Sequence, residues 1–204
     1  MSEMIEAVVF DVGQVLVEWD MRCLLRKLYR SEDEVRWAFE NVVSLEWHFQ
    51  HDCGRDLDEM LAERIAQFPD HAHALEAYAT RFLETIPGPI PGTAELVGEL
   101  AGRGVPLYAI TNFPAKFWEE FHPTEPVIGH FRDVIVSGVE KLAKPDPAIF
   151  RLAERRFGHP AAAMLFIDDS ERNVAAARDC GWQAHLFTDA EALAAELRER
   201  GLLG

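Results

Sequence analysis

The chain has 204 residues with 20 basic and 35 acidic side chains, which gives a formal net charge of −15. Hydrophobic residues make up 49% and charged residues 27%, both near globular averages, so the composition argues against a disordered protein. Nucleic-acid binding needs a concentrated basic surface to neutralise phosphates, and this acidic chain argues against that class of partner.

Other features of the composition concern the cellular compartment. No run approaches the roughly 20 apolar residues of a membrane span, and the start MSEMIEAVVF lacks the basic region of a signal peptide. The three cysteines, Cys23, Cys53 and Cys180, show no CxxC spacing, which is typical of reduced thiols. We therefore expect a cytoplasmic protein without a membrane partner, and the sequence carries no indication of an oligomeric state.

The first predicted element is an apolar strand, IEAVVF at 5–10. Residues 20–84 have a helical pattern, rich in aromatic and acidic residues, with no convincing strand. This region closes with IPGPIPG at 86–92, whose prolines and glycines predict a stiff turn or hinge. We predict that 20–84 is a helical insertion, which leaves the sheet after the first strand and returns at the hinge.

Beyond the hinge, short apolar runs alternate with helical patterns. Four such runs predict strands, at 106–111, 133–137, 164–168 and 183–187. Near-continuous apolar strands separated by helices are typical of a parallel sheet covered on both faces. The predicted fold class is therefore α/β, a Rossmann-like parallel sheet with helices on both faces and an inserted helical segment. For the helix over 93–101, Thr93 is predicted as the N-cap and Gly102 as the stop.

Polar residues stand where the predicted strands end, namely Asp11, Thr111, Asn112, Asp168 and Asp169, and Lys144 lies in a loop. In open parallel sheets, reactive groups collect at the carboxyl ends of the strands. Two carboxylates about 5 Å apart repel by roughly 3 kcal/mol at an effective dielectric constant of about 20. Three acidic groups at one edge therefore need a shared proton or a bound cation.

The types of ligand at these strand ends favour one cation over another. They offer only oxygen atoms, with no His or Cys, which favours Mg²⁺ over Zn²⁺. A magnesium ion beside a free carboxylate, a lysine and a hydroxyl forms a suitable site for a phosphoryl group. The residues thus predict Mg²⁺-dependent phosphoryl chemistry with Asp11 as a possible nucleophile.

Four sequence motifs resemble those of the haloacid dehalogenase-like (HAD) hydrolases: FDVGQVLVEWD, the Thr-Asn pair after the second strand, KPDPAIF and FIDDSERN. The resemblance spans essentially the whole chain. It implies an α/β hydrolase core at 1–18 and 86–204 and a helical (C1-type) cap at 19–85. Within the superfamily the chain is most similar to bacterial sugar-phosphate phosphatases of the glucose-1-phosphatase kind.

The resemblance implies a Mg²⁺ site and a covalent mechanism. Asp11 would attack phosphorus to form an aspartyl-phosphate, and Asp11, the Gly13 carbonyl and Asp169 would bind the metal. Asp168 would bind it through water or orient a ligand. Asn173, one helical turn after Asp169, is expected to hydrogen-bond that residue.

The phosphoryl group would be held by the other motifs. Thr111 would donate its hydroxyl to it, helped by the backbone amide of Asn112. Lys144 would neutralise Asp11 and the phosphoryl oxygens. The family also uses the cap stretch near 46–54 to touch substrate, which makes Trp47, His48 and His51 candidate specificity residues.

The position of Gly13 departs from the family pattern. Most phosphatases of the family carry Asp there as a general acid and base, a contribution worth roughly 10²–10⁴ in rate. Three interpretations stay open. The leaving group departs unaided, a cap residue such as Glu46, His48 or His51 replaces the acid, or turnover is slow.

The predicted substrate is a small phosphorylated metabolite, in particular a sugar phosphate, and the predicted cofactor is Mg²⁺. Two other functions are compatible with the motifs. One is a 2-haloacid dehalogenase, in which the same Asp11 attacks carbon, although such enzymes need no metal and typically lack the acidic pair. The other is a catalytically silent protein that binds a phosphorylated metabolite.

Overall fold

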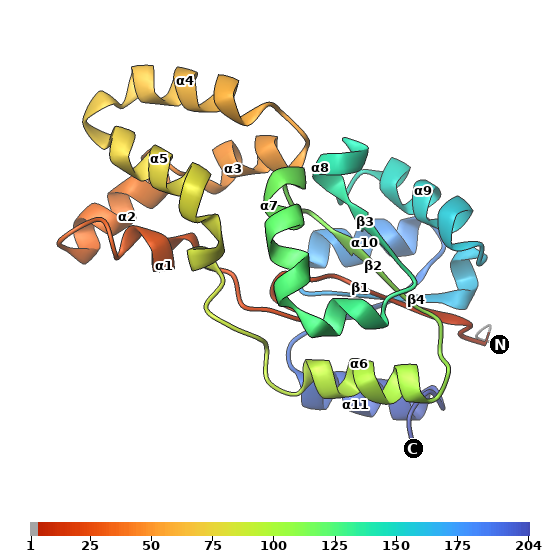
Figure 1. Ribbon diagram of the computed structural model, residues 1–204. Coiled ribbons are helices and arrows are strands. Elements are labelled where there is room, and N and C mark those ends of the chain that lie inside the picture. The colour runs from red at the N-terminus through yellow and green to blue at the C-terminus, as the bar shows by residue number, and fades with distance from the viewer. Residues whose placement is uncertain (1–3) are drawn as a thin grey trace.

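The computed structural model describes residues 4–204, and within this range one parallel sheet of five strands forms the centre (Figure 1). The strand order is β3-β2-β1-β4-β5, so β1 lies in the middle. The strands are β1 (Ala7–Phe10), β2 (Leu107–Thr111), β3 (Asp133–Val136), β4 (Met164–Asp168) and β5 (Gln183–Leu186). Each lies within a run predicted from the sequence, and the α/β parallel-sheet prediction is confirmed.

Helices cover both faces of the sheet. Successive residues of a strand point to opposite faces, so each strand contributes side chains to two hydrophobic clusters. Val8 and Phe10 of β1 face one hydrophobic cluster, and Ala7 and Val9 face another. The first cluster includes buried residues of α6 (Thr93–Gly102), α7 (Ala115–Phe121) and α11 (Ala190–Glu199). The second includes buried residues of α9 (Pro147–Phe157) and α10 (Glu171–Asp179), on the opposite side of the sheet (Figure 1).

The segment between β1 and α6 folds into a separate group of helices, seen at the upper left of Figure 1. We call it the helical insertion; it comprises α1 (Met21–Leu25), α2 (Glu32–Asn41), α3 (Leu45–Asp52), α4 (Leu57–Gln67), the 3₁₀ turn η1 (Pro69–His71), α5 (Ala72–Arg81) and the 3₁₀ turn η2 (Phe82–Thr85). The helix starts are locally encoded. The side chains of Asp20, Ser31, Ser44 and Asp56 each accept a hydrogen bond from a backbone N–H of the first turn.

Two chain segments connect the helical insertion to the sheet, and they run side by side. Val17 forms an isolated antiparallel bridge with Pro89. Glu18 N donates to Gly88 O and Ile90 N donates to Leu16 O, each at 2.8 Å. This pairing fixes where the insertion leaves and rejoins the core.

The start of α6 differs from the prediction. Gly92, not Thr93, occupies the N-cap position, with a left-handed φ of 85° that glycine adopts without strain. Thr93 is the first helical residue and is fully buried, and its hydroxyl has no hydrogen-bond partner among residues 4–204. The predicted stop is confirmed, since Gly102 is the last residue of α6.

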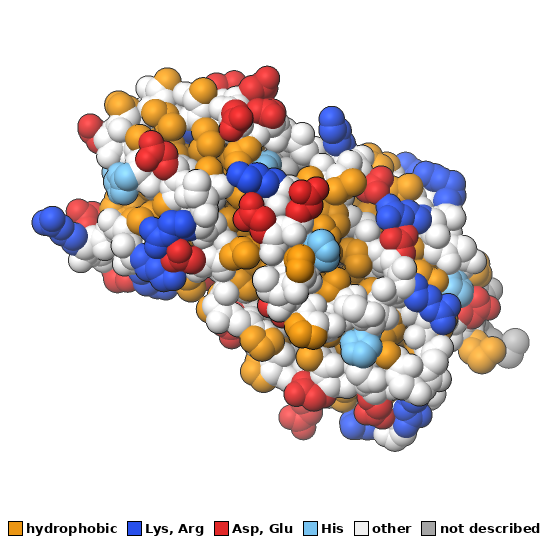
Figure 2. Space-filling model, in the orientation of Figure 1, with side chains coloured by type: hydrophobic (Ala, Val, Ile, Leu, Met, Phe, Trp, Pro, Cys, Tyr) orange, Lys and Arg blue, Asp and Glu red, His pale blue; other side chains and the backbone are white. Residues whose placement is uncertain are grey.

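The remaining short elements are α8 (Ser137–Glu140) and the 3₁₀ turns η3 (His122–Thr124), η4 (Pro126–His130) and η5 (Ala161–Ala163). On the face shown in Figure 2, acidic and basic side chains are interspersed. Within residues 4–204, no helix combines the length and the apolar character required to cross a membrane.

Candidate active site

Three neighbouring strands end at the polar residues identified in the sequence. β1 pairs in parallel with both β2 and β4, so their carboxyl ends meet at one edge of the sheet. Asp11 follows β1, Thr111 ends β2 and Asp168 ends β4. The fold thereby brings these residues together, although they are far apart in the sequence.

The carboxylates of Asp11, Asp168 and Asp169 form an acidic cluster at this edge. One oxygen from each lies within 4.8 Å of the others. Burial raises the pKa of Asp11 to about 8, with further upward contributions from Asp168 and Asp169 that Lys144 partly offsets. Burial and Asp168 likewise raise the pKa of Asp169. The cluster therefore holds more negative charge than its surroundings compensate, a condition that a divalent cation relieves.

Lys144 lies between two of the clustered carboxylates. Its Nζ is 2.8 Å from Asp11 Oδ1 and 2.7 Å from Asp168 Oδ2, and the side chain is 1% exposed. Burial alone lowers the pKa of Lys144, but Asp11 and Asp168 outweigh it, so that the pKa is raised. Lys144 is therefore a fully buried cation in direct contact with the predicted nucleophile.

The side chain of Asn112 positions the backbone of Lys144. Asn112 Nδ2 donates to Lys144 O, and Asn112 Oδ1 accepts from Lys144 N, each at 2.9 Å. The resemblance implied a role for the backbone amide of Asn112 alone. The structure adds this positioning contact, which the sequence did not indicate because it joins residues 32 positions apart.

The amide of Asn173 contacts Asp168 and not, as expected, Asp169. Asn173 Nδ2 lies 3.0 and 3.1 Å from the two carboxylate oxygens of Asp168. Helix α10 begins only at Glu171, so the intervening turn brings Asn173 back over the end of β4. Ser170 N also donates to Asp168 Oδ1, at 2.9 Å. With both oxygens occupied, Asp168 is better placed to orient Lys144 than to bind a cation.

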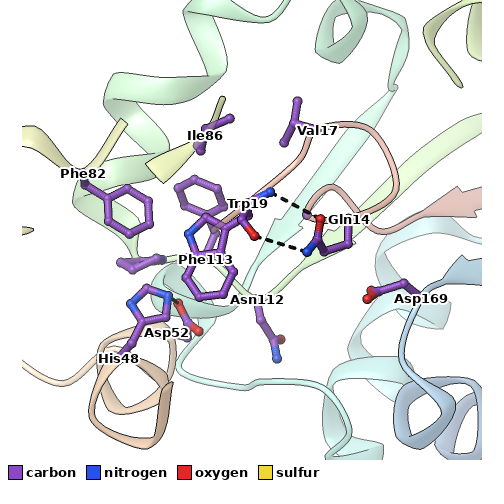
Figure 3. Close-up of a pocket in the computed structure, with 12 residues that line it drawn as sticks. Gln14, Val17, Trp19, His48, Asp52, Phe82, Ile86, Asn112, Phe113 and Asp169 are labelled. Atoms are coloured by element: carbon purple, nitrogen blue, oxygen red, sulfur yellow. Dashed lines mark hydrogen bonds and ion pairs between the residues drawn. The ribbon is translucent and has the colours of Figure 1, made fainter. Parts of the chain in front are cut away.

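A cavity of about 230 Å³ lies beside the acidic edge (Figure 3). Its lining comes from both the core and the helical insertion and comprises Gly13, Gln14, Val17, Trp19, His48, Asp52, Phe82, Ile86, Asn112, Phe113, Pro114 and Asp169. In Figure 3, Asp169 lies at one end of this cavity, while His48, Asp52 and Phe82 lie at the other. The cavity thus joins the acidic edge to an end rich in aromatic side chains.

Gly13 faces this cavity without steric restriction. A Cβ atom at Gly13 would meet no atom within 4 Å. Its backbone φ lies outside the left-handed region in which a side chain is strained. The glycine is therefore not required by backbone geometry, and the position can accept a carboxylate side chain.

A buried group of titratable side chains in the helical insertion reaches the cavity through His48. Tyr78 Oη lies 2.8 Å from His48 Nδ1 and 3.0 Å from His51 Nδ1. One phenol donates a single proton, so it donates to one imidazole and accepts from the other. Burial lowers the pKa of His48 to about 3 and that of His51 to about 4, so both are neutral at pH 7.

Asp52, which no sequence motif singled out, adjoins this group. Its Oδ1 is 3.4 Å from His48 Nε2. Burial raises the pKa of Asp52 to about 8, partly offset by Lys144, so that Asp52 is a neutral carboxylic acid at pH 7. Since His48 is neutral too, the contact is not an ion pair. The i, i+4 spacing of His48 and Asp52 on one face of α3 was the available sequence signal.

The candidate specificity residues of the insertion divide into two groups. His48 lines the cavity, whereas Trp47 and His51 do not. Trp47 is buried against Tyr78, with the ring centroids 4.9 Å apart, and belongs to the hydrophobic core. Glu46 is exposed and lies outside the cavity lining. A helix exposes only part of its circumference to a cavity, so neighbouring positions in sequence face different surroundings.

Comparison with known proteins identifies the family. The sequence model of the haloacid dehalogenase-like hydrolase family matches residues 5–181, which cover most of the chain. The chain belongs to the haloacid dehalogenase-like hydrolases. The resemblance stated from the sequence motifs is thereby confirmed at the level of the superfamily.

Among curated relatives, this HAD-like hydrolase is similar to phosphatases. Sesquiterpene phosphatase astK from Aspergillus oryzae is 27% identical over 199 residues, which cover 95% of each chain. A phosphoglycolate phosphatase from Pseudomonas syringae pv. tomato is 32% identical over 125 residues, which cover 61% of this chain but 43% of that enzyme. These relatives support a phosphatase hydrolase.

Solved structures show the same fold. A HAD family enzyme from Bacteroides thetaiotaomicron, in complex with magnesium and inorganic phosphate, aligns with a TM-score of 0.68 at 22% identity, over 91% of this chain and 95% of that one. The L-2-haloacid dehalogenase from Xanthobacter autotrophicus aligns with a TM-score of 0.61 at 21% identity, over 96% of this chain and 83% of that one. At these identities the likeness concerns the fold alone.

Proposed function

We propose that this protein is a Mg²⁺-dependent phosphatase that hydrolyses a small phosphate monoester through an aspartyl-phosphate. The observation that supports it most is the contact of buried Lys144 with both Asp11 and Asp168, at 2.8 and 2.7 Å. A lysine that neutralises a carboxylate nucleophile also attracts the oxygens of a phosphoryl group.

The acidic cluster fits a magnesium ion. Its side chains offer only oxygen donors within 4.8 Å of one another, the ligand type that Mg²⁺ prefers. Asp11, Asp169 and the carbonyl of Gly13 would hold the ion, since the oxygens of Asp168 already have protein partners. Bound there, Mg²⁺ would supply positive charge to the phosphoryl oxygens.

In the proposed reaction, a carboxylate oxygen of Asp11 forms a bond to phosphorus as the ester P–O bond breaks. Lys144, the hydroxyl of Thr111 and the backbone amide of Asn112 hold the phosphoryl oxygens meanwhile. Water then attacks phosphorus, and the bond between Asp11 and phosphorus breaks, which releases inorganic phosphate and regenerates the carboxylate.

The departing ester oxygen needs a proton, which Gly13 cannot supply. Of the residues on the insertion side of the cavity, neutral His48 is a poor proton donor at pH 7, whereas Asp52 is protonated there. Asp52 also lines the same cavity as Gly13 and Asp169. We assign to Asp52 the proton transfer to the leaving group, in place of the missing acid. The Asp52 carboxylate then takes a proton from the water that attacks the aspartyl-phosphate, which restores its acid form.

The resemblance to glucose-1-phosphatases predicts a sugar phosphate as the substrate, and this stays a prediction. The HAD fold is shared with the L-2-haloacid dehalogenases, so the reaction type needs a direct test. Purified protein would be assayed with nitrophenyl phosphate and with a 2-chlorinated carboxylic acid, each with Mg²⁺ and with a chelator. We expect phosphate release from nitrophenyl phosphate with Mg²⁺ and none with the chelator. Halide release, or no turnover of either compound, would contradict the proposal.

A further inference from the structure

We infer that the group esterified to phosphate is a compact hydrocarbon, aryl or cycloalkyl, rather than a sugar. This inference rests on the proposed phosphatase function and concerns the substrate of the same site. The observation behind it is the composition of the cavity end remote from Asp169, where Trp19, Phe82, Ile86 and Phe113 supply apolar surface (Figure 3).

The aromatic side chains at this end are held by one another. The ring of His48 stacks between Trp19 and Phe82, with centroid distances of 5.1 and 5.6 Å. Phe82 also meets Phe113 edge to face at 5.7 Å. Rings packed on several sides keep their orientation, so this wall presents a preformed apolar surface to a ligand.

The two amide side chains of the lining are engaged with the backbone. Gln14 Nε2 donates to Trp19 O at 3.2 Å, and Gln14 Oε1 accepts from Trp19 N at 3.3 Å (Figure 3). The amide of Asn112 is bonded at both ends to the backbone of Lys144. Both residues would otherwise be the natural partners of sugar hydroxyls.

The other polar groups at the aromatic end also offer few atoms that are free to hydrogen-bond a ligand. His48 has one ring nitrogen on Tyr78 and the other facing Asp52. Trp19 Nε1 and Asp52 Oδ1 lack hydrogen-bond partners within the part of the chain that the structure describes, yet both atoms are covered from solvent. What remains is the second oxygen of Asp52, a single polar atom that cannot match the several hydroxyls of a sugar.

A sugar brings a hydroxyl on nearly every carbon, and most of these would lose their hydrogen bonds to water without gaining a partner here. The cavity volume of about 230 Å³ lies below the typical range of about 300–1,000 Å³ for ligand pockets, which limits the hydrocarbon to a compact one.

The test compares two esters that share a six-membered ring and a primary alcohol. Cyclohexylmethyl phosphate is the hydrocarbon analogue, and glucose-6-phosphate is the hydroxylated one. Acetyl phosphate, which has almost no leaving-group surface, measures the basal phosphatase activity. With Mg²⁺ present, we expect kcat/KM for cyclohexylmethyl phosphate to exceed that for glucose-6-phosphate by about 100-fold or more.

Two matched variants connect this preference to the cavity. Ile86 and Ile90 are both half-buried against the same core cluster, but only Ile86 lines the cavity. Ile86→Thr places a hydroxyl in the apolar wall, and we expect the ratio of kcat/KM for cyclohexylmethyl phosphate to acetyl phosphate to fall about 10-fold. Ile90→Thr should leave that ratio unchanged.

The outcomes separate the inference from the proposed function. Hydrolysis of acetyl phosphate with equal or greater activity on glucose-6-phosphate would overturn the inference and leave the phosphatase intact. An unchanged ratio in Ile86→Thr would overturn it as well. If neither of the two esters nor acetyl phosphate is hydrolysed with Mg²⁺, the phosphatase proposal itself fails and the inference fails with it.

Discussion

The acidic edge of the sheet and the insertion side of the cavity both bury titratable groups, but only the acidic edge holds a buried cation. Burial and the neighbouring carboxylates raise the pKa of Asp11 there to about 8, and a divalent cation bound beside it would lower that pKa and leave the nucleophile ionised. At the sheet edge, Lys144 stays charged because Asp11 and Asp168 raise its pKa against the effect of burial. On the insertion side, burial leaves His48 neutral with a pKa of about 3 and Asp52 neutral with a pKa of about 8.

The difference reflects the available partners. Charged groups persist in a protein interior when an opposite charge lies at hydrogen-bond distance, as for Lys144 at 2.7 Å from Asp168. Where no such partner exists, the buried group takes its neutral form instead. In the proposed mechanism, the first region polarises phosphate, and the second offers a proton and an apolar surface to the leaving group.

The largest expected effect comes from the sheet edge. Asp11→Asn keeps the shape of the side chain and removes the attacking charge, so turnover of nitrophenyl phosphate should fall by at least about 1,000-fold. The variant should still fold, because Lys144 keeps its contact with Asp168. Circular dichroism and denaturant unfolding provide the folding control. A folded variant that retains more than a few per cent of activity would rule out the covalent mechanism.

Removal of the buried cation should cost stability. Lys144→Met leaves Asp11 and Asp168 without their counter-charge, and we expect the free energy of unfolding to fall by about 3–5 kcal/mol. Lys141→Met, at an exposed lysine of the same loop, is the matched control and should change stability little. Urea denaturation of both variants measures the difference. Equal effects would show that charge compensation at the sheet edge is unimportant.

The role of Asp52 can be tested by removing one acid and adding another. Asp52→Asn should slow alkyl phosphates by roughly 10²-fold while slowing nitrophenyl phosphate less, because only the former need a proton on the leaving oxygen. Gly13→Asp introduces a carboxyl at a position where an added Cβ atom meets no atom within 4 Å. In the double variant Gly13→Asp, Asp52→Asn it should restore the rate on alkyl phosphates. If Asp52→Asn slows both ester classes equally, Asp52 is not the proton donor.

Asp52 should also give stability a recognisable pH dependence. Its folded pKa of about 8 exceeds the unfolded value of about 3.9, so the folded protein binds the extra proton and loses stability as pH rises. The expected loss is up to about 1.4 kcal/mol per pH unit between pH 6.5 and 8. The opposite effect of His48, with a folded pKa of about 3, fades as the unfolded imidazole loses its proton and ends by about pH 7.5.

Urea denaturation of wild type and Asp52→Asn across this pH window isolates the contribution of Asp52. Asp11 titrates in the same window and is present in both proteins, so its effect cancels in the comparison. The variant should lose stability less steeply than the wild type. Parallel pH profiles would mean that Asp52 is ionised in the folded protein.

The sheet and the acidic edge were predictable because their signals are local. Each strand is a short apolar run, and a parallel sheet places every strand end at one edge, which is how Asp11 and Asp168 meet. Two local predictions were wrong for geometric reasons. Gly92 rather than Thr93 caps α6, and Asn173 contacts Asp168 because a turn separates β4 from α10.

The cavity was not predictable from spacing. Its wall combines Trp19, His48, Phe82 and Phe113, which come from four separate segments of the chain. Helical periodicity does not say which side of α3 faces the core, so Trp47 and His51 were grouped with His48 although only His48 lines the cavity. The neutral state of Asp52 likewise depends on burial by residues distant in sequence.

The proposed mechanism requires above all that Asp11 carries the phosphoryl group during turnover. Wild type turning over nitrophenyl phosphate with Mg²⁺ would be quenched in acid, digested, and the peptide containing Asp11 examined by mass spectrometry. We predict a single phosphoryl group on that peptide, lost on treatment with hydroxylamine and absent from Asp11→Asn. Turnover without an adduct on Asp11, or an adduct on another residue, would contradict this mechanism.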